Sequence, residues 1–447
     1  MLNSFIFIFK WVYFFIKFKF NYKWITTTFD GGIYLKENLL HLGIIGIKFG
    51  QFLYARKDIL TQDATVALEP LLSSNSIHNE EDTKQMLLHD KRGYYINNIH
   101  RIEKDCLGSG SLAQVHICYL KEQPEKKYIL KVAHPCVFEL ENEINILKKL
   151  LNLFGRFKKI NIDWDTFFKN ITVQTDLTNE ANNMQKFYNI YKNYEKIDIP
   201  ELIYNDKYFI VMTYCEGVPM NKLDRKSKEF ISGTNLLASC FFHTVYKYSM
   251  CHGDMHFGNI LVKPNGFISL IDFGICNYDI NNDTDCETTQ IIKKINKNEV
   301  LYNYREFLIK QSVRSIDVLL SCLVTLPKNI SANYINQISL NFVSYIQSYK
   351  QDKNTYMYND LYYMDLIFNF CNDYNLQING EAVYVILQLV TLEAFADPET
   401  NNGMVTMRTM SYMKTDSFFM SEIGDFITKF YKLEYYSADE ELRNKYP

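Results

Sequence analysis

Three polar residues in the middle of the chain have the types and spacing needed for phosphoryl transfer. Asp254 follows a His-Gly pair, Asn259 comes five residues later, and Asp272 opens an Asp-Phe-Gly sequence thirteen residues after the asparagine. A carboxylate at the first position can orient an attacking hydroxyl group and accept its proton, whereas an amide and a second carboxylate can hold Mg²⁺ on nucleotide phosphates. We therefore predict Asp254 as the catalytic base or orienting residue, and Asn259 and Asp272 as metal ligands.

A short hairpin is predicted to bring Asn259 and Asp272 together. Apolar runs at residues 260–262 and 267–271 flank a Pro-Asn-Gly sequence at 264–266, and such turns join neighbouring antiparallel strands. The alternative is a hairpin with ordinary turn carboxylates, which a single Asp-Phe-Gly sequence would not exclude. The two spacings and the preceding His-Gly pair favour phosphoryl transfer.

A glycine-rich segment upstream has the composition of a loop that binds nucleotide phosphates. Residues 108–115 read Gly-Ser-Gly-Ser-Leu-Ala-Gln-Val, which matches Gly-x-Gly-x-x-Gly-x-Val with alanine at the third glycine. Small residues let backbone N–H groups approach phosphate oxygens without obstruction by Cβ atoms. Taken alone, the segment could equally be the turn of a glycine hairpin. The residues predicted to contact nucleotide are Gly108, Ser109, Gly110, Ser111, Ala113 and Val115.

Lys131 follows the second glycine of this loop by 21 residues and interrupts an apolar run. A lysine in an apolar strand normally needs a partner, because burying an unpaired ammonium group is unfavourable. In phosphotransferases with this order of elements, the lysine contacts the α- and β-phosphates and is oriented by a glutamate on a helix. We predict Glu180 as that partner. Glu143, on an earlier helix, is the alternative, and an exposed lysine on an edge strand is less favoured.

The composition is that of a globular protein with more than one lobe. The 447 residues are 47% hydrophobic and 22% charged, which allows two or three substantial cores. The net charge of −3 gives no electrostatic argument for nucleic-acid binding. The ten cysteines form no Cys-x-x-Cys pairs, so we expect neither a zinc site nor a disulfide framework, but free thiols in a reducing, intracellular compartment.

The N-terminal segment is apolar and aromatic, with interspersed lysines. Residues 5–16 are apolar except for Lys10, Trp11 and Tyr13. Lys17, Lys19 and Lys23 follow among further aromatic residues. The run is shorter than the ~20 residues that span a bilayer comfortably, and it lacks a small-residue cleavage site. Such a segment suits a membrane interface, where lysines reach the headgroups. A helix packed onto the body of the protein explains the pattern equally well.

The surrounding patterns predict the elements that position these residues. We expect helical structure at 37–67, a polar linker with a short helix at 73–91, three strands within 99–132, helices at 138–154 and 164–191, strands near 202–204 and 208–212, and core helices at 319–326 and 384–394. This order predicts an α+β, bilobal fold. Its parts are a hydrophobic, basic segment at 1–30, a helical extension at 31–95, a small β-rich N-lobe at 96–216 and a helical C-lobe at 217–447.

These elements together resemble the UbiB family of atypical kinases, the aarF-domain proteins linked to coenzyme Q metabolism. The resemblance runs from about Leu42 to Cys276. It includes a Lys-x-Gly-Gln helix at 48–51, which ordinary protein kinases lack, and the His-x-Asp-x-His-x-Gly-Asn loop at 252–259. The Lys-Val-Ala-His-Pro strand that begins at Lys131 and a Glu-Gly-Val-Pro hinge further along also match.

The resemblance implies a kinase-like fold whose N-terminal extension lies across the active site, with Lys48 and Gln51 directed inward as nucleotide-binding residues. That arrangement obstructs protein substrates, and no Ala-Pro-Glu sequence follows Gly274 in this chain. The resemblance also implies ATP and Mg²⁺ as cofactors, ATP hydrolysis or transfer, and association with a lipid or a membrane surface.

Three features of the sequence depart from the family pattern. Glycine occupies positions 108 and 110 in a loop that is alanine-rich in the family, which puts the usual nucleotide preference and phosphotransfer competence in question. A neutral Gln174 replaces the first carboxylate of the Glu-x-Asp element, so autoinhibition by Lys48 is also in question. Thr213 stands where glutamate usually precedes the hinge, a minor change because adenine is bound there mainly through the backbone.

Two other functions stay open at this point. A small-molecule phosphotransferase of the choline-kinase or aminoglycoside-kinase kind shares the His-Gly-Asp and Ile-Asp-Phe patterns, but it lacks the Lys48 helix. A non-catalytic, nucleotide-gated binding protein would use the same fold as a switch, although the catalytic positions all hold competent residues.

Overall fold

Contacts within the computed structural model divide the chain into two compact units. Unit 1 consists of Met1–Lys186 and Pro200–Tyr214, and unit 2 consists of Phe187–Ile199 and Cys215–Pro447. The structure describes residues 2–54, 59–72, 77–153, 164–248, 250–278 and 405–428, with short pieces between residues 324 and 378. The four-part division expected from the sequence stays a prediction.

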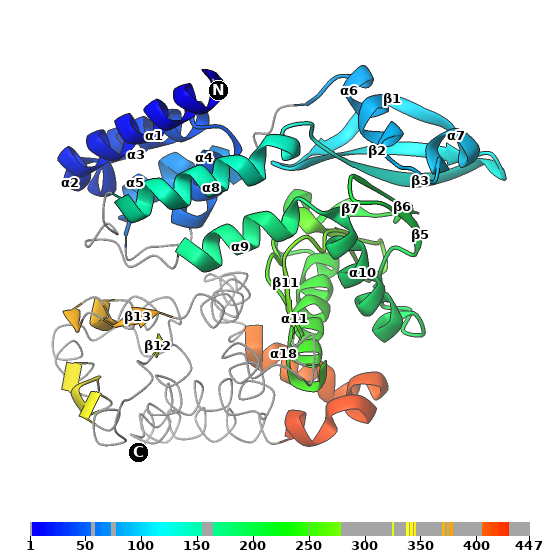
Figure 1. The fold of residues 1–447 in the computed structure, drawn as a ribbon. Helices are drawn as coiled ribbons and strands as arrows, with labels where there is room; N and C mark the ends of the chain where they lie inside the picture. The colour runs from blue at the N-terminus through cyan, green and yellow to red at the C-terminus, as the bar shows by residue number, and fades with distance from the viewer. Residues whose placement is uncertain are drawn as a thin grey trace, which may run out of the picture. The chain divides into compact units, whose positions relative to one another are not determined.

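Unit 1 begins with a helical layer that carries the Lys-x-Gly-Gln sequence. Its elements are α1 (Leu2–Phe20), α2 (Tyr22–Thr27), α3 (Phe29–His41), α4 (Ile44–Tyr54), α5 (Gln62–Leu68) and the 3₁₀ turn η1 (Glu69–Leu72). α1 lies beside α8 (Val137–Leu153), as Figure 1 shows. One face of α1 is aromatic and buried, with Trp11, Phe14, Phe15 and Phe18 all less than 9% exposed. The N-terminal segment therefore packs onto its own unit along this face.

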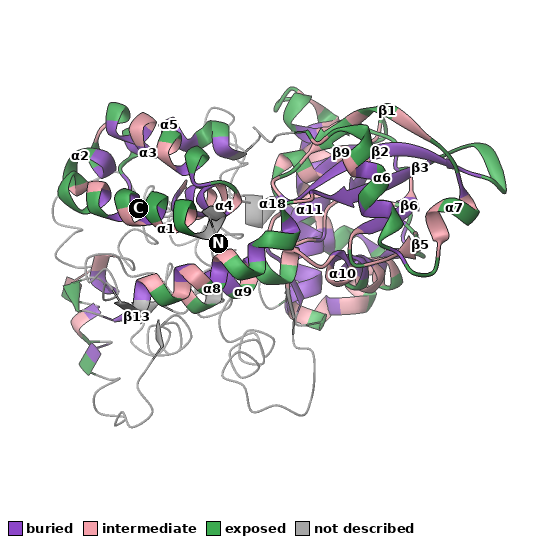
Figure 2. Cartoon of the chain, turned by 45° about the horizontal axis from the view of Figure 1, so that its top comes forward, coloured by how far each residue is buried: buried purple, intermediate pink, exposed green. Residues whose placement is uncertain are grey.

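A five-stranded antiparallel sheet follows in unit 1. Its strands are β1 (Ile99–Ser109), β2 (Ala113–Leu120), β3 (Gln123–Ala133), β5 (Leu202–Asn205) and β6 (Phe209–Thr213), in the order β1-β2-β3-β6-β5. The three strands predicted within 99–132 are thus present, and β6 and β5 extend them. The second half of β3 and most of β6 are buried, which Figure 2 shows in purple. The continuous apolar run around Lys131 reflects this central position in the sheet.

The other helices up to Tyr191 are α6 (Glu80–Leu88), α7 (Tyr94–Asn98), α8, α9 (Trp164–Gln174) and α10 (Leu177–Tyr191); α6 contacts β3 and α7 contacts β1. The single helix predicted at 164–191 is wrong, because α9 and α10 are separated at residues 175–176. Asp176 Oδ1 accepts hydrogen bonds from the backbone N–H of Thr178 at 3.0 Å and from its hydroxyl at 2.6 Å. A side chain that caps a new helix start in this way competes with continuation of the preceding helix.

Unit 2 is built around a small sheet and a long buried helix. The sheet contains β4 (Ile197–Asp198), β10 (Ile268–Leu270), β9 (Ile260–Val262) and β7 (Val218–Pro219), in that order. The long helix is α11 (Lys228–Tyr248), and β8 (Met250–His252) pairs with β11 (Cys276–Tyr278). The short 3₁₀ turns η2 (Met220–Lys222) and η3 (Phe257–Asn259) complete this part.

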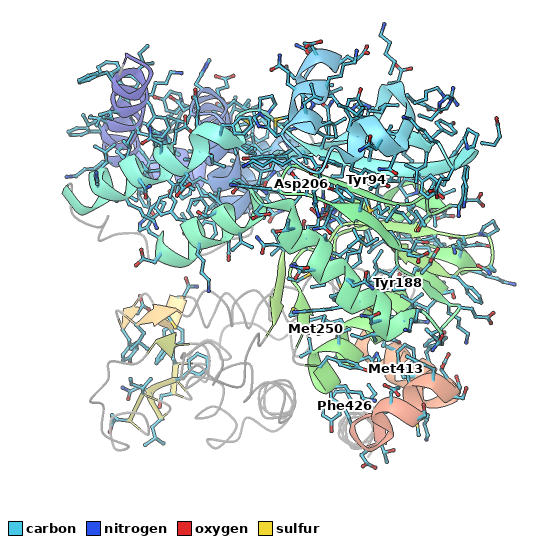
Figure 3. All side chains as sticks on the ribbon, turned by 45° about the vertical axis from the view of Figure 1, so that its right-hand side comes forward. Tyr94, Tyr188, Asp206, Met250, Met413 and Phe426 are labelled. Atoms are coloured by element: carbon cyan, nitrogen blue, oxygen red, sulfur yellow. The ribbon has the colours of Figure 1, made fainter. Side chains whose placement is uncertain are left out.

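The C-terminal helical residues pack against α11. α18 (Val405–Thr415) contacts α11, and the Phe426 ring stacks on Tyr246 with 4.5 Å between ring centroids. Figure 3 marks Met413 and Phe426 in this part of unit 2; both are at most 2% exposed.

The predicted core helix at 319–326 is wrong at the two residues that the structure describes. β12 (Val324–Thr325) pairs antiparallel with β13 (Gln377–Ile378), so these residues are extended. The remaining residues of that segment, and the helix predicted at 384–394, lie outside the described residues.

Candidate phosphoryl-transfer site

Lys131 and Glu180 form a buried ion pair in unit 1. Lys131 Nζ lies 2.5 Å from Glu180 Oε1, and the two side chains are 11% and 7% exposed. Lys131 comes from β3, the middle strand of the sheet, and Glu180 from the first turn of α10. The attraction between the two charges offsets the cost of removing each from water. Glu180 is thus the partner predicted for Lys131. The alternative, Glu143, lies on α8, where burial raises its pKa.

The glycine-rich segment forms the turn between β1 and β2. The N–H of Gly110 donates to the carbonyl of Ala113 at 2.8 Å, and Gly108 is paired with Val115 across the hairpin. An added Cβ at Gly108 would meet no atom within 4 Å, and one at Gly110 would approach only the Ala113 carbonyl, at 3.4 Å. Packing of the hairpin therefore does not require glycine at either position. An approaching phosphate would benefit from the missing side chains.

A buried histidine connects the two predicted acidic residues of unit 2. His252 is 1% exposed. Its Nε2 lies 2.5 Å from the carbonyl oxygen of Asp272, and its Nδ1 accepts from the N–H of Asp254 at 3.2 Å. These partners require a neutral ring protonated at Nε2. Burial agrees with this state because it lowers the pKa of His252. The ring therefore fixes the start of the His-Gly-Asp loop to the Asp-Phe-Gly segment.

Asp254 and Asn259 are in direct contact. Asn259 Nδ2 donates to the carbonyl oxygen of Asp254 at 3.0 Å and to its Oδ2 at 3.3 Å. The side chain of Asp254 is 41% exposed, so it can meet a hydroxyl group from solution. His256 lies nearby, with Nε2 3.7 Å from Asp254 Oδ2. Its Nδ1 accepts from the N–H of Gly258 at 3.0 Å, so the neutral ring carries its proton on the side of Asp254.

The β9–β10 hairpin brings Asn259 next to Asp272. Ile271 N–H donates to the Asn259 carbonyl at 3.1 Å, and Gly266 occupies the turn with φ 77°. Asp272 Oδ1 accepts from the N–H of Gly274 at 2.9 Å. The hairpin predicted from the Pro-Asn-Gly sequence is present and pairs Asn259 with the residue before Asp272; the shared metal stays a prediction.

The donors of this hairpin fit Mg²⁺. Within the described residues, no group of three or more His, Cys, Asp and Glu side chains could hold a metal ion. Asn259 Oδ1 and the Asp272 carboxylate are oxygen donors, and Mg²⁺ typically takes one or two protein oxygens together with water and substrate phosphates. The pair therefore suits a metal that arrives with a nucleotide.

Lys48 and Gln51 occupy different surroundings within unit 1. Lys48 Nζ donates to Gln174 Oε1 at 2.7 Å. The neutral glutamine that replaces the family's carboxylate therefore still accepts a hydrogen bond from the lysine. Gln174 Nε2 donates to the carbonyl of Asn170 at 2.9 Å, which directs its oxygen towards Lys48. Gln51 Nε2 donates to the carbonyl of Leu71 at 2.9 Å and ties α4 to η1.

The close contact of Gly50 with η1 accounts for the glycine of the Lys-x-Gly-Gln sequence. A Cβ at this position would lie 2.3 Å from Leu71 Cδ1. Leu71 is fully buried, so an added Cβ would force this side chain to shift within the core. Glycine thus allows the close approach of η1 that the Gln51 hydrogen bond needs.

The sequence analysis missed the histidines that hold the site. His252 and His256 lie inside the motif, but only the acidic residues and the asparagine received roles. His78, His134 and Gln114 were not assigned roles from the sequence. Yet Gln114 and its neighbour His116 are polar residues in an apolar strand, and both are at most 5% exposed. The signal was the same as for Lys131: a polar side chain in an apolar run needs a partner.

Residues 72–301, just over half of the chain, match the model of a family described as the ABC1 atypical kinase-like domain. The chain belongs to this family. Membership confirms the resemblance to UbiB and aarF-domain proteins and an α+β, bilobal kinase-like fold. ABC1 membership supports a kinase-type phosphotransferase in general terms.

Relatives of the chain include proteins named as kinases. The chain is 26% identical over 252 residues to "Probable protein kinase UbiB" of Histophilus somni, covering 52% of this chain and 46% of that protein. It is 26% identical over 228 residues to "AarF domain-containing protein kinase 1" of Xenopus laevis, covering 49% and 44%. A protein of Clostridium pasteurianum described as uncharacterized is 28% identical over 254 residues, covering 54% and 47%. The chain thus spans about half the length of the curated relatives it matches.

Among solved structures, this chain is similar to the complex of Rv3197 with erythromycin from Mycobacterium tuberculosis. The matched region covers 70% of this chain and 81% of that chain. The TM-score is 0.44 and the sequence identity 18%.

Proposed function

We propose that this ABC1-family chain binds Mg²⁺–ATP and transfers or hydrolyses the terminal phosphate. The buried Lys131–Glu180 pair carries the proposal. A buried ion pair adds little to the net stability of a fold, because apolar residues of similar volume commonly stabilise it as well. The presence of this pair on a central strand that follows a glycine-rich turn is better explained by a task for the lysine, namely holding phosphate oxygens.

Each predicted residue has a defined task in this function. Lys131 holds the α- and β-phosphates, Glu180 orients it, and backbone N–H groups of the β1–β2 turn contact phosphate oxygens. Asp254 orients the attacking hydroxyl group or water and accepts its proton. Asn259 and Asp272 hold Mg²⁺, which neutralises negative charge on the phosphates.

Thermal unfolding with and without nucleotide tests this proposal. A ligand present at 100 times its Kd that binds only the folded state adds about 2.7 kcal/mol to the free energy of unfolding. We expect Mg²⁺–ATP to raise the unfolding temperature of the wild type. Removing Mg²⁺ should reduce that increase, as should the Asp272→Asn substitution.

The test of Lys131 requires a control variant in which no buried charge is left without its partner. Lys131→Met alone leaves Glu180 uncompensated, so a low unfolding temperature would have two explanations. The double variant Lys131→Met, Glu180→Gln removes both charges, and its nucleotide effect is compared with its own unliganded baseline. A full Mg²⁺–ATP effect in this double variant would remove the proposed role of Lys131.

We further propose that unit 1 contacts a lipid surface through the exposed face of α1. Phe5, Phe9 and Phe20 are 68%, 72% and 81% exposed, opposite the buried aromatic face. Lys10 and Lys19 are exposed among them. Aromatic rings beside lysines are the combination that enters the headgroup region of an anionic membrane. None of the described helices has both the length and the apolar character needed to cross a bilayer.

Sedimentation with vesicles tests the lipid proposal. We expect the protein to pellet with vesicles that contain phosphatidylserine, and Phe5→Ser with Phe9→Ser to reduce the bound fraction. Ile96→Ser is the matched control, because Ile96 is an apolar side chain on α7 that is 62% exposed. Equal binding of the double variant and the control would exclude this face of α1 as the lipid contact.

A further inference from the structure

A hydrogen-bonded network in unit 1 joins the β1–β2 turn to the segment that precedes α6. His134 follows β3 and is 5% exposed. Its Nε2 lies 3.0 Å from the carbonyl oxygen of Gly110 and 3.3 Å from the hydroxyl of Ser109. Its backbone N–H donates to the carbonyl of Leu112 at 2.8 Å. One histidine thus contacts Ser109 at the end of β1 and both Gly110 and Leu112 of the turn.

His134 is in turn held by a second histidine. His78 Nδ1 lies 2.6 Å from His134 Nδ1, and His78 Nε2 lies 3.0 Å from the Thr83 hydroxyl. The main chain of His78 is fixed by Gln114: its N–H donates to Gln114 Oε1 at 3.0 Å, and its carbonyl accepts from Gln114 Nε2 at 3.3 Å. Gln114 lies on β2 and is 1% exposed.

The partners determine where each imidazole carries its proton. A carbonyl oxygen only accepts, so His134 Nε2 must be protonated to donate to Gly110. In a neutral ring His134 Nδ1 is then an acceptor, and His78 Nδ1 must be the donor. His78 Nε2 consequently accepts from the Thr83 hydroxyl. Burial keeps both rings neutral, because it lowers the pKa of His134 and lowers that of His78 to about 4.

The far end of the network obeys the same logic. Gln114 Nε2 donates to His116 Nε2 at 2.9 Å, so the neutral His116 ring is protonated at Nδ1. That N–H faces the carbonyl oxygen of Glu103 at 3.1 Å. With this assignment of protons, every donor in the network meets an acceptor. Such a network fixes the geometry of the groups that it connects.

We propose that His134 is a positioning residue for the β1–β2 turn, and that His78 holds it in the tautomer that donates to Gly110. The proposal deepens the proposed function, because the turn it shapes is the one assigned to nucleotide phosphates. His78 lies shortly after the helical layer in the sequence, so the network also connects the chain leaving that layer to the turn. A turn held in advance loses less conformational entropy when it orders around a ligand.

Hydrogen exchange of the unliganded protein, followed by mass spectrometry over residues 108–114, tests the positioning role. His134→Leu fills the space of the ring without an N–H, whereas His134→Gln places an N–H near the position of Nε2. We expect exchange in the turn to be roughly five- to tenfold faster in the leucine variant, as expected for the loss of one hydrogen bond. The glutamine variant should return towards wild type. His100→Leu, an exposed histidine of β1, serves as the control.

The second histidine is tested in the same experiment. His78→Asn keeps an N–H near the position of Nδ1, and His78→Leu does not. The asparagine variant should protect the turn better than the leucine variant. Wild-type exchange rates in both leucine variants would overturn the proposal, as would a glutamine variant no better than leucine at position 134.

A measurement on the unsubstituted protein covers the case in which variants fail to fold. ¹⁵N spectra of the histidine side chains report which ring nitrogen carries the proton. We expect His134 protonated at Nε2 and His78 at Nδ1; His134 protonated at Nδ1 would overturn the assignment.

Nucleotide binding separates this proposal from the proposed function. If the wild type binds Mg²⁺–ATP, His134→Leu should raise the KM for ATP several-fold with a smaller change in kcat. If the wild type binds no nucleotide, the proposed function fails, while the exchange and tautomer results still decide whether His134 positions the turn.

Discussion

Glu180 of unit 1 and Asp254 of unit 2 are both carboxylates with a task in the proposed function, yet the side chain of Glu180 is 7% exposed and that of Asp254 is 41% exposed. The lysine pair, Lys131 with Glu180, is enclosed in unit 1 and each charge compensates the other. The acid loop of unit 2, which contains Asp254, Asn259 and Asp272, is held by neutral contacts from His252 and from backbone groups. Each charge of the lysine pair thus needs its partner, whereas we propose that the charges of the acid loop serve substrate and metal.

This difference predicts that the acid loop can lose its chemistry while the fold persists. In Asp272→Asn the side-chain oxygen that accepts from the Gly274 N–H is retained, so this contact survives and the variant should remain folded. Turnover of ATP should fall by at least about a hundredfold, because the charge that holds Mg²⁺ is lost. Mg²⁺-dependent ATPase activity and chemical denaturation check the two halves of this prediction. Activity that survives the substitution would rule out Asp272 as the metal ligand.

The lysine pair should behave in the opposite way. Glu180→Ala leaves a buried ammonium group without its partner, so unfolding should cost about 3–5 kcal/mol less than in the wild type. Adding Lys131→Met to a Glu180→Leu background should recover much of that loss, since neither charge is then buried. Denaturation midpoints of the single and double variants give the coupling between the two residues. Additive losses would mean that the fold does not depend on the pair.

Lys131 and the hairpin were predictable because their signals are local, whereas Glu180, 49 residues from Lys131, was predicted from the kinase-like order of elements. Lys131 stands out against its apolar neighbours, and the Pro-Asn-Gly turn sets the β9–β10 register that joins Asn259 to Asp272. The contact of His78 with His134 joins residues 56 positions apart, and no local pattern specifies that pairing. The break between α9 and α10 was missed because helical apolar spacing continues through it, while the capping by Asp176 depends on one side chain.

Acid should weaken both units through buried neutral histidines. His78 in unit 1 and His243 in unit 2 each have a pKa lowered to about 4, mainly by burial, against 6.5 in the unfolded chain. Between these values the unfolded chain binds more protons than the folded chain, so the free energy of unfolding decreases as the pH falls from 6.5 towards 4. Full stability is present above about pH 6.5.

Substitution identifies the histidine that acts in each unit. His243→Asn should make stability less dependent on pH between 6.5 and 4, by up to about 3 kcal/mol, because its side chain is fully buried. His78→Asn should have a smaller effect in the same direction. Denaturation at pH 7.5 and 5 checks both, and His100→Asn serves as the exposed control. Unchanged pH dependence in the His243 variant would show that other groups dominate.

A smaller effect is expected where α4 meets α9. Gln174→Glu supplies a carboxylate to Lys48, whose Nζ already lies 2.7 Å from Gln174 Oε1. A charge-assisted hydrogen bond is roughly twice as strong as a neutral one, so unit 1 should gain about 1 kcal/mol. If Lys48 restrains nucleotide access, the same variant should weaken ATP binding, and Lys48→Met should strengthen it. Calorimetric titration with Mg²⁺–ATP measures both, and Gln51→Met is the comparison variant because its amide is bonded to the Leu71 carbonyl instead.

The smallest effect should be found at Gly108, near the end of β1 and beside the β1–β2 turn. Gly108→Ala adds a Cβ that meets no protein atom within 4 Å, at a position without a left-handed φ. Replacing glycine also reduces the freedom of the unfolded chain, so stability should be unchanged or rise by up to about 1 kcal/mol. Any change in ATP affinity or in the ratio of ATP to ADP affinity would then come from the methyl group meeting the ligand, because the protein itself has room for it. Unaltered binding of both nucleotides would show that Gly108 lies outside the phosphate contact and would restrict the phosphate-binding role to the turn that begins at Gly110.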